Sequence, residues 1–131
     1  MQRLRISSGS PFEPVIGFSR AVRVGERVLV SGTAPIRADG EVDPDPGEQM
    51  ALCLEIVGEA LAEAGATWTD VVRTRTYLTD PSDWEAIGAR LGSVFGDIRP
   101  ASTMVVVVAL LDPRWKVEIE VEAVVAPADG S

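Results

Sequence analysis

The segment Pro100-Ala-Ser-Thr-Met-Val-Val-Val-Val-Ala-Leu-Leu111, followed after a short turn by Val117-Glu-Ile-Glu120, decides the fold of this 131-residue chain. Residues 104–111 form an uninterrupted apolar run, which is typical of a strand that is buried on both faces. In the second piece, acidic and apolar residues alternate with a period of two, which places the acids on one face of a strand. We therefore predict strands over residues 103–111 and 116–125.

Two helices are expected upstream of this segment. Apolar residues follow the helical period across residues 47–65, and Gly65 stands where a helix commonly ends. A second helix is predicted after residue 80, where Ser82 and Glu85 have the spacing of a capping box. Gly88 and Gly92 lie inside it, and such glycines often mark close packing or a ligand against the backbone.

The remaining strands complete an α+β pattern. Residues 20–24 and 27–31 read as a hairpin whose Gly25-Glu26 turn suits type II′, and residues 71–78 read as a further strand. The first sixteen residues are expected to be an irregular arm or an edge strand. The order ββ-α-β-α-ββ predicts two helices on one face of a mixed sheet, in a single domain over residues 1–131. Because this chain has no third layer to cover the second side of the strand 104–111, an oligomer is expected.

The amino-acid composition argues against several classes of function. The net charge of −8, without a run of basic residues, disfavours nucleic-acid binding. The chain has no histidine, which removes the usual general base and the usual zinc ligand, so a transition-metal site is not expected. No organic cofactor is expected either. Cys53 is the one cysteine, which favours a buried structural thiol and a cytoplasmic protein. No signal peptide and no membrane span are predicted.

Several short motifs resemble, in their order and spacing, the RidA/YjgF family, also known as endoribonuclease L-PSP. They are Val30-Ser31-Gly32, Gln49, Ala64-Gly65, residues 70–80, Asp83-Trp84, Pro100-Ala101 and Val117-Glu118-Ile119-Glu120. The resemblance covers nearly the whole chain. It implies a homotrimer around a central barrel, with small-molecule clefts between subunits and with hydrolysis of reactive enamines and imines.

The resemblance also assigns roles residue by residue. The family's arginine after Pro-Ala binds a substrate carboxylate, and Ser102 stands in its place here. Glu120 corresponds to the glutamate that positions the attacking water, and Ser31–Gly32 to the backbone donors. Phe18 replaces the family's tyrosine, and Gly88 replaces its asparagine. Without the arginine, a carboxylate would be bound roughly thirtyfold to several-thousandfold more weakly.

These residues also have plainer interpretations. Glu118, Glu120 and Glu122 can form an ordinary solvated strand face, and Ser31–Gly32 can be a simple turn. Two functions therefore remain open. One is a divergent imine or enamine hydrolase for a small neutral substrate, in which Glu120 steers water. The other is a non-catalytic trimer that binds a neutral metabolite. Endoribonuclease roles attached to the family rank third, because the chain is acidic and lacks histidine.

Overall fold

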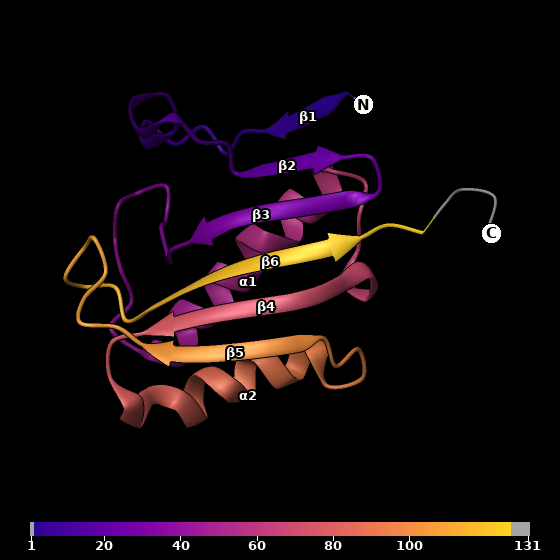
Figure 1. The fold of residues 1–131 in the computed structure, drawn as a ribbon. Helices are drawn as coiled ribbons and strands as arrows, with labels where there is room; N and C mark the ends of the chain where they lie inside the picture. Colours follow the sequence, from indigo (N-terminus) through magenta and orange to yellow (C-terminus); the bar gives the residue numbers. More distant parts are fainter. Residues whose placement is uncertain (1, 127–131) are drawn as a thin grey trace.

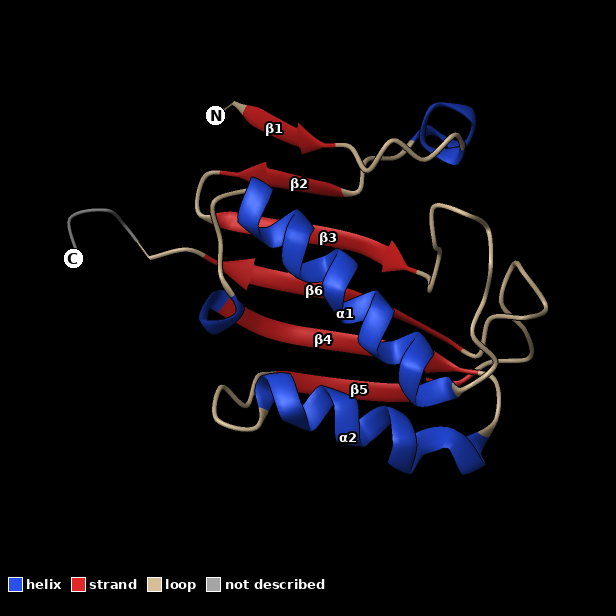
Figure 2. Ribbon diagram, turned by 180° about the vertical axis from the view of Figure 1, so that it is seen from behind, coloured by secondary structure: helices blue, strands red, loops and turns tan. Residues whose placement is uncertain are grey.

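The computed structural model describes residues 2–126, which form one six-stranded sheet with two helices on one of its faces (Figures 1 and 2). The strands are β1 (Arg3–Ile6), β2 (Ala21–Val24), β3 (Arg27–Thr33), β4 (Val71–Leu78), β5 (Ala101–Val106) and β6 (Val117–Val124). Their order across the sheet is β1-β2-β3-β6-β4-β5. β4 and β5 run parallel, and the other neighbours are antiparallel. The predicted α+β fold is confirmed.

The helices α1 (Pro46–Glu63) and α2 (Trp84–Phe95) cover the same face, as the view from behind in Figure 2 shows. The apolar stripe of α1 packs on the apolar side of β6, where alternate residues are buried as the period of two predicts. The core residues that these two elements contribute are Met50, Cys53, Leu54, Val57, Ala60, Leu61, Val117, Ile119, Val121 and Ala123. Within residues 2–126, no helix is long and apolar enough to cross a membrane.

Two local predictions are wrong. The strand predicted over 103–111 runs over Ala101–Val106, because its neighbour β4 ends at Leu78, which pairs with Val106. Val108 and Leu111 lie beyond the sheet and are exposed. Ser82 does not cap α2. Its backbone N–H instead donates to the Asp80 carboxylate at 2.9 Å, since an acid before Pro81 caps the short 3₁₀ turn that precedes the helix.

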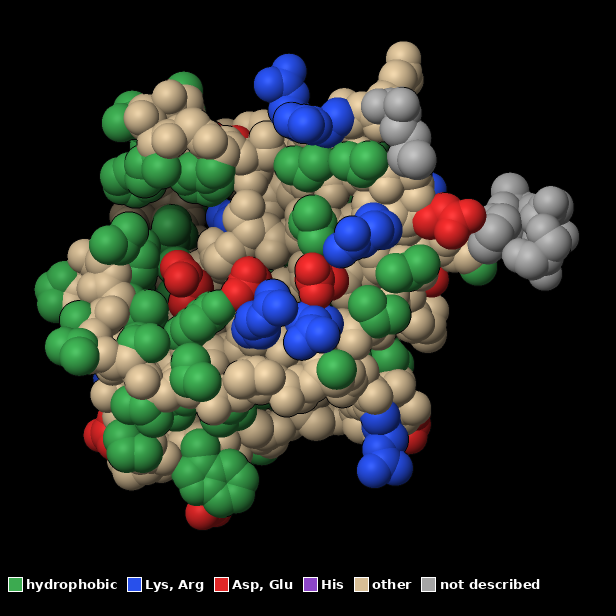
Figure 3. All heavy atoms as spheres, in the orientation of Figure 1, with side chains coloured by type: hydrophobic (Ala, Val, Ile, Leu, Met, Phe, Trp, Pro, Cys, Tyr) green, Lys and Arg blue, Asp and Glu red, His purple; other side chains and the backbone are tan. Residues whose placement is uncertain are grey.

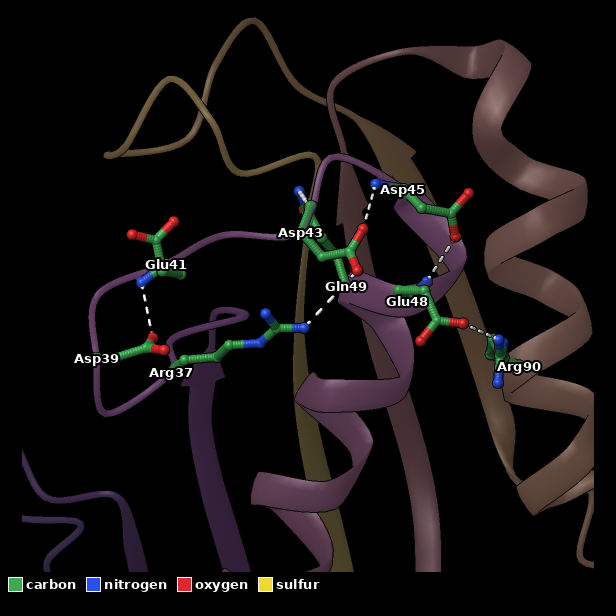
Figure 4. Close-up of polar contacts among 8 residues, drawn as sticks. All are labelled: Arg37, Asp39, Glu41, Asp43, Asp45, Glu48, Gln49 and Arg90. Carbon is green, nitrogen blue, oxygen red and sulfur yellow. Dashed lines mark hydrogen bonds and ion pairs between the residues drawn. The ribbon is translucent and has the colours of Figure 1, made fainter.

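The helix α1 begins after a long loop, and a buried glutamine holds the end of this loop in place (Figure 4). Gln49 is 1% exposed, and its side-chain amide donates to the Asp43 carbonyl at 2.7 Å and accepts from the Lys116 N–H at 2.7 Å. Asp45 caps the helix by accepting from the Glu48 N–H at 2.8 Å. Gln49 thereby ties the loop before α1 to the start of β6.

The face of the sheet opposite the helices carries the acids of β6 (Figure 3). Glu122 pairs with Arg73 at 3.2 Å and with Arg27 at 3.7 Å, and Glu120 pairs with Arg75 at 3.9 Å. These pairs are partly exposed, so each stabilises the fold by roughly 1 kcal/mol or less. The predicted common face of the three acids is confirmed, and it is cross-linked by arginines from both neighbouring strands.

The glycines inside α2 are not sites of close packing. A Cβ on Gly92 would meet no heavy atom within 4 Å, and one on Gly88 would make an ordinary contact with Trp84. We expect Gly92→Ala to raise the free energy of unfolding by about 1 kcal/mol, because alanine is the better helix former. Urea denaturation measures this change. As a contrast, Gly65→Ala is expected to destabilise, because Gly65 has φ +82° and Arg23 Nη1 lies 2.7 Å from the position of a Cβ.

Candidate functional site

The Ser31–Gly32 pair lies at the end of β3, where the pairing with β6 shifts register between Val30 and Thr33. Such bulges redirect side chains and often lie beside functional sites. The Ser31 N–H donates to the Arg20 carbonyl at 3.0 Å, and its hydroxyl donates to the Ser19 carbonyl at 2.7 Å. Gly32 is exposed. The Ser31 N–H is therefore already bonded, and Gly32 is the accessible member of the pair.

Arg20 is the first residue at this site that the sequence did not single out. It is 8% exposed, and its Nη2 donates to the Gly32 carbonyl at 2.6 Å. Its guanidinium carbon lies 5.7 Å from the centre of the Phe18 ring, within the range of a cation–π contact. Burial lowers the pKa of Arg20, and the nearby carboxylates of Glu13 and Glu118 raise it. The buried guanidinium of Arg20 is thus bonded directly to the backbone of Gly32.

Glu118 is the second such residue. Its side chain is half-buried, and its Oε2 lies 3.2 Å from the position that a Cβ on Gly32 would occupy. Burial raises the pKa of Glu118, the positive charge of Arg20 lowers it, and the neighbouring Glu120 carboxylate raises it. The net direction is upward from the ordinary value of 4.5. A partly buried carboxylate whose pKa is raised has the property that a general base needs.

Glu120, in contrast, is held by its own partners. Its carboxylate accepts a hydrogen bond from the Tyr77 hydroxyl and pairs with Arg75 at 3.9 Å. This hydrogen bond is the main reason why the pKa of Tyr77 is raised. The geometry places the Glu118 carboxylate, and not the Glu120 carboxylate, against Gly32. The catalytic role expected for Glu120 remains a prediction that no contact in the described chain supports.

A short π-helical turn, Glu13–Gly17, lies before Phe18 and borders the site. Glu13 is buried and accepts from the N–H and the hydroxyl of Ser8, at 3.0 and 2.6 Å. Burial alone would raise the pKa of Glu13, but these and further hydrogen bonds lower it below its ordinary value. Val15 and Ile16 on the turn are exposed. Figure 3 shows this face hollowed at the left, with apolar side chains around the hollow and acidic ones toward the middle of the sheet.

Ser102 and Gly88 do not lie beside Gly32 and Glu118. Ser102 is on β5 opposite Thr74, two strands away from β6, and it lines an open cavity of about 310 Å³ with Leu91, Phe95 and Arg99. Gly88 is on α2 and contacts neither this cavity nor Gly32. Within one copy of the chain, the predicted site residues therefore form two groups. Phe18, Ser31 and Gly32 lie with Arg20 and Glu118, and Ser102 lies apart from them.

Removing the Glu118 charge is expected to stabilise the protein at neutral pH. Because the folded pKa of Glu118 is raised, its ionisation opposes folding, and wild type loses stability as pH rises from the ordinary value of 4.5 through the folded pKa. Glu118→Gln should therefore melt a few degrees above wild type at pH 7–8. The difference should shrink at pH 4, where both side chains are neutral. Melting curves across this range check the sign, and a lower melting temperature at pH 7–8 would contradict it.

Comparisons with known proteins agree with this fold and length. The sequence model described as Endoribonuclease L-PSP matches residues 9–125. An uncharacterized protein of Streptomyces coelicolor is 41% identical over 91% of this chain and 90% of its own length, and a RutC family protein of Pyrococcus abyssi is 36% identical over 86% and 87%. A crystal structure from Mycobacterium tuberculosis, described as a member of the YjgF/YER057c/UK114 family, has a TM-score of 0.88 and 45% identity, covering 95% of this chain and 100% of that one. This chain therefore belongs to the RidA/YjgF family, whose sequence model carries the description Endoribonuclease L-PSP.

Proposed function

We propose that this protein hydrolyses small imines or enamines that carry no carboxylate, with Glu118 as the general base. The observation that carries the proposal is the half-buried Glu118 carboxylate, held against the exposed backbone of Gly32 with a raised pKa. A carboxylate with a raised pKa is a stronger base toward water than an ordinary exposed glutamate. The role that the family resemblance gives to Glu120 passes to Glu118 on this geometry.

The reaction needs one carboxylate and one water molecule. Glu118 takes a proton from the water, whose oxygen forms a bond to the C=N carbon, and returns the proton to the nitrogen to give a carbinolamine. A second proton transfer, from the carbinolamine hydroxyl to the nitrogen, breaks the C–N bond and releases a carbonyl compound and ammonia. An enamine enters the same route as its imine tautomer. The water adds and no electrons are exchanged, so the overall reaction is a hydrolysis.

The absence of a substrate carboxylate follows from the charges around Glu118. The site has one guanidinium, Arg20, and its nearby carboxylates are Glu13 and Glu118. Ser102 cannot neutralise an anion as the family's arginine does. An added carboxylate would face net negative charge, whereas a neutral or protonated imine would not.

We further propose that the protein acts as a cytoplasmic homotrimer whose small-molecule clefts lie between subunits. The exposed apolar residues Val105 and Val106 on the edge strand β5, and Val108 and Leu111 just after it, support an uncovered contact surface. Within one chain, Ser102 on β5 is separated from Glu118 on β6 by β4, so the two lie at different places on the sheet. Sedimentation equilibrium measures the assembly, and a monomer at micromolar concentration would contradict it.

Two imines that differ by a carboxylate test the proposed reaction. Ethanimine is generated in situ by an amine oxidase and 2-iminopropanoate by an amino-acid oxidase, and semicarbazide traps whatever remains. We expect the protein to accelerate the decay of ethanimine and to act far less on 2-iminopropanoate. No acceleration of either over buffer would reject the hydrolase, and a preference for 2-iminopropanoate would reject the carboxylate-free substrate class.

The cavity beside Ser102 favours a second candidate function, the binding of a neutral metabolite without turnover. It is lined by the apolar Leu91 and Phe95, by the hydroxyl-bearing Thr74 and Ser102, and by Arg99. Apolar walls with a few polar groups are typical of a small-molecule site. A metabolite that raises the melting temperature of wild type, but not of Ser102→Trp, would support this function. No shift with any compound of a neutral panel would remove its basis.

A further inference from the structure

The buried guanidinium of Arg20 is incompletely bonded. Its Nη2 donates to the Gly32 carbonyl, while its Nε is buried and has no hydrogen-bond partner among the described residues. Burying a charged group without full compensation is costly, and such groups are kept where they serve a site. No carboxylate forms a salt bridge with Arg20 within 4.0 Å in the described chain. Its positive charge is therefore available to act on groups slightly farther away.

Glu118 is the group that this charge reaches on the side of Gly32. The titratable groups around Glu118 come from three directions. Glu120 is on the same strand, Tyr77 on β4 is the cross-strand neighbour of Glu118, and Cys53 on α1 is near enough for its pKa to be affected by the Glu118 charge. Burial and the Glu120 carboxylate raise the pKa of Glu118, and Arg20 is the cation that lowers it. The pKa of Cys53 is raised, chiefly by burial, so its thiol stays neutral and adds no charge.

We propose that Arg20 is a positioning residue that holds the Gly32 peptide in place and keeps the neighbouring Glu118 carboxylate ionised. One side chain thus connects the two parts of the site. Its hydrogen bond fixes the Gly32 carbonyl, and its charge offsets the burial of the base that lies over Gly32. The catalytic meaning of this arrangement rests on the proposed hydrolase function. The electrostatic coupling itself can be measured without any substrate.

Without Arg20, Glu118 would remain half-buried beside Glu120 but would lose its compensating cation. Its pKa would then be higher, so a larger fraction of it would be protonated at a given pH, and a protonated carboxyl cannot accept a proton from water. Arg20→Met removes the charge and keeps much of the apolar stem. Arg20→Lys keeps the charge and loses the planar fork. Arg5→Met removes an equal charge from an exposed position on β1 and serves as the matched control.

Titration of the protein labelled with ¹³C at the glutamate carboxyls tests the proposal, with the Glu118 signal assigned by its loss in Glu118→Gln. We expect the Glu118 midpoint to move to higher pH in Arg20→Met, to stay close to wild type in Arg20→Lys, and to be unchanged in Arg5→Met. An unmoved midpoint in Arg20→Met, or an equal shift in Arg5→Met, would overturn the proposal. If Arg20→Met does not fold, Arg20→Gln replaces it, because it loses the charge but keeps a donor for the Gly32 carbonyl. The same criteria then apply.

The pH profile of hydrolysis provides the second readout. The acidic limb of the kcat/KM profile for ethanimine should move to higher pH in Arg20→Met and back toward the wild-type position in Arg20→Lys. A purely structural role would not produce this pattern. If wild type hydrolyses no imine, the proposed function fails, while the NMR titration still decides the coupling between Arg20 and Glu118. If wild type is active and the limb does not move, the positioning role fails and the hydrolase stands.

Discussion

We expect Glu118→Gln to reduce kcat/KM for ethanimine by about 10²- to 10⁴-fold, which is the usual contribution of a positioned general base. Glutamine has nearly the same shape as glutamate, so the contact with Gly32 and the packing of β6 are kept. Its amide cannot take a proton from water. Because the folded pKa of Glu118 is raised, the variant should also be at least as stable as wild type. A loss of rate together with unchanged or improved stability identifies a catalytic group, and not a structural one.

The matched control is Glu120→Gln, on the same strand and the same face. Its carboxylate is bonded to Tyr77 and paired with Arg75, away from Gly32, so we expect a rate close to that of wild type. Rates are measured by semicarbazide trapping, and folding by the melting temperature. The reverse outcome, with Glu120→Gln inactive and Glu118→Gln active, would return the catalytic role to Glu120.

Much of the fold is readable from the sequence because local patterns and tertiary packing agree there. The strand predicted over residues 71–78 matches β4, which is rich in β-branched residues and also holds Tyr77. The end of β5 was not predictable. The apolar run continues to Leu111, but hydrogen bonding stops where β4 stops, and the length of a neighbour is not encoded in the run itself. The predicted Ser82 cap of α2 was wrong because a local contact decided it. The Asp80 carboxylate accepts the Ser82 N–H and caps the 3₁₀ turn that precedes the helix.

Only part of the candidate site could be predicted from the sequence. A period of two places Glu118, Glu120 and Glu122 on one face but does not say which of them meets Gly32. The register shift between Val30 and Thr33 decides this, and bulges leave little trace in a sequence. Arg20 gave no functional signal, because an arginine at the start of a predicted strand is ordinarily solvent-exposed. Its burial and its bond to Gly32 appear only once β2 and β3 are in place.

Substitution of Gly32 is expected to reduce activity without weakening the fold. A Cβ at this position would lie 3.2 Å from Oε2 of Glu118, which is tighter than most side-chain contacts. The obstacle is the end of a flexible side chain, so the carboxylate moves and the backbone does not. Gly32 also lies in a strand without a positive φ, where β-branched residues are favoured. Valine should therefore be tolerated by β3 and should displace the base.

We expect kcat/KM to fall about tenfold in Gly32→Ala and about a hundredfold in Gly32→Val, because displacement of a catalytic group by up to about 1 Å costs up to that factor. The melting temperature should be unchanged or slightly raised in both. Gly92→Ala, a glycine substitution with free space around it, should leave the rate unchanged. If Gly32→Val keeps full activity, the base does not act over Gly32, and the assignment of Glu118 loses its geometric support. If Gly32→Val instead unfolds the protein, Gly32→Ala decides, because its single methyl group needs a shift of only a few tenths of an ångström from a movable side chain.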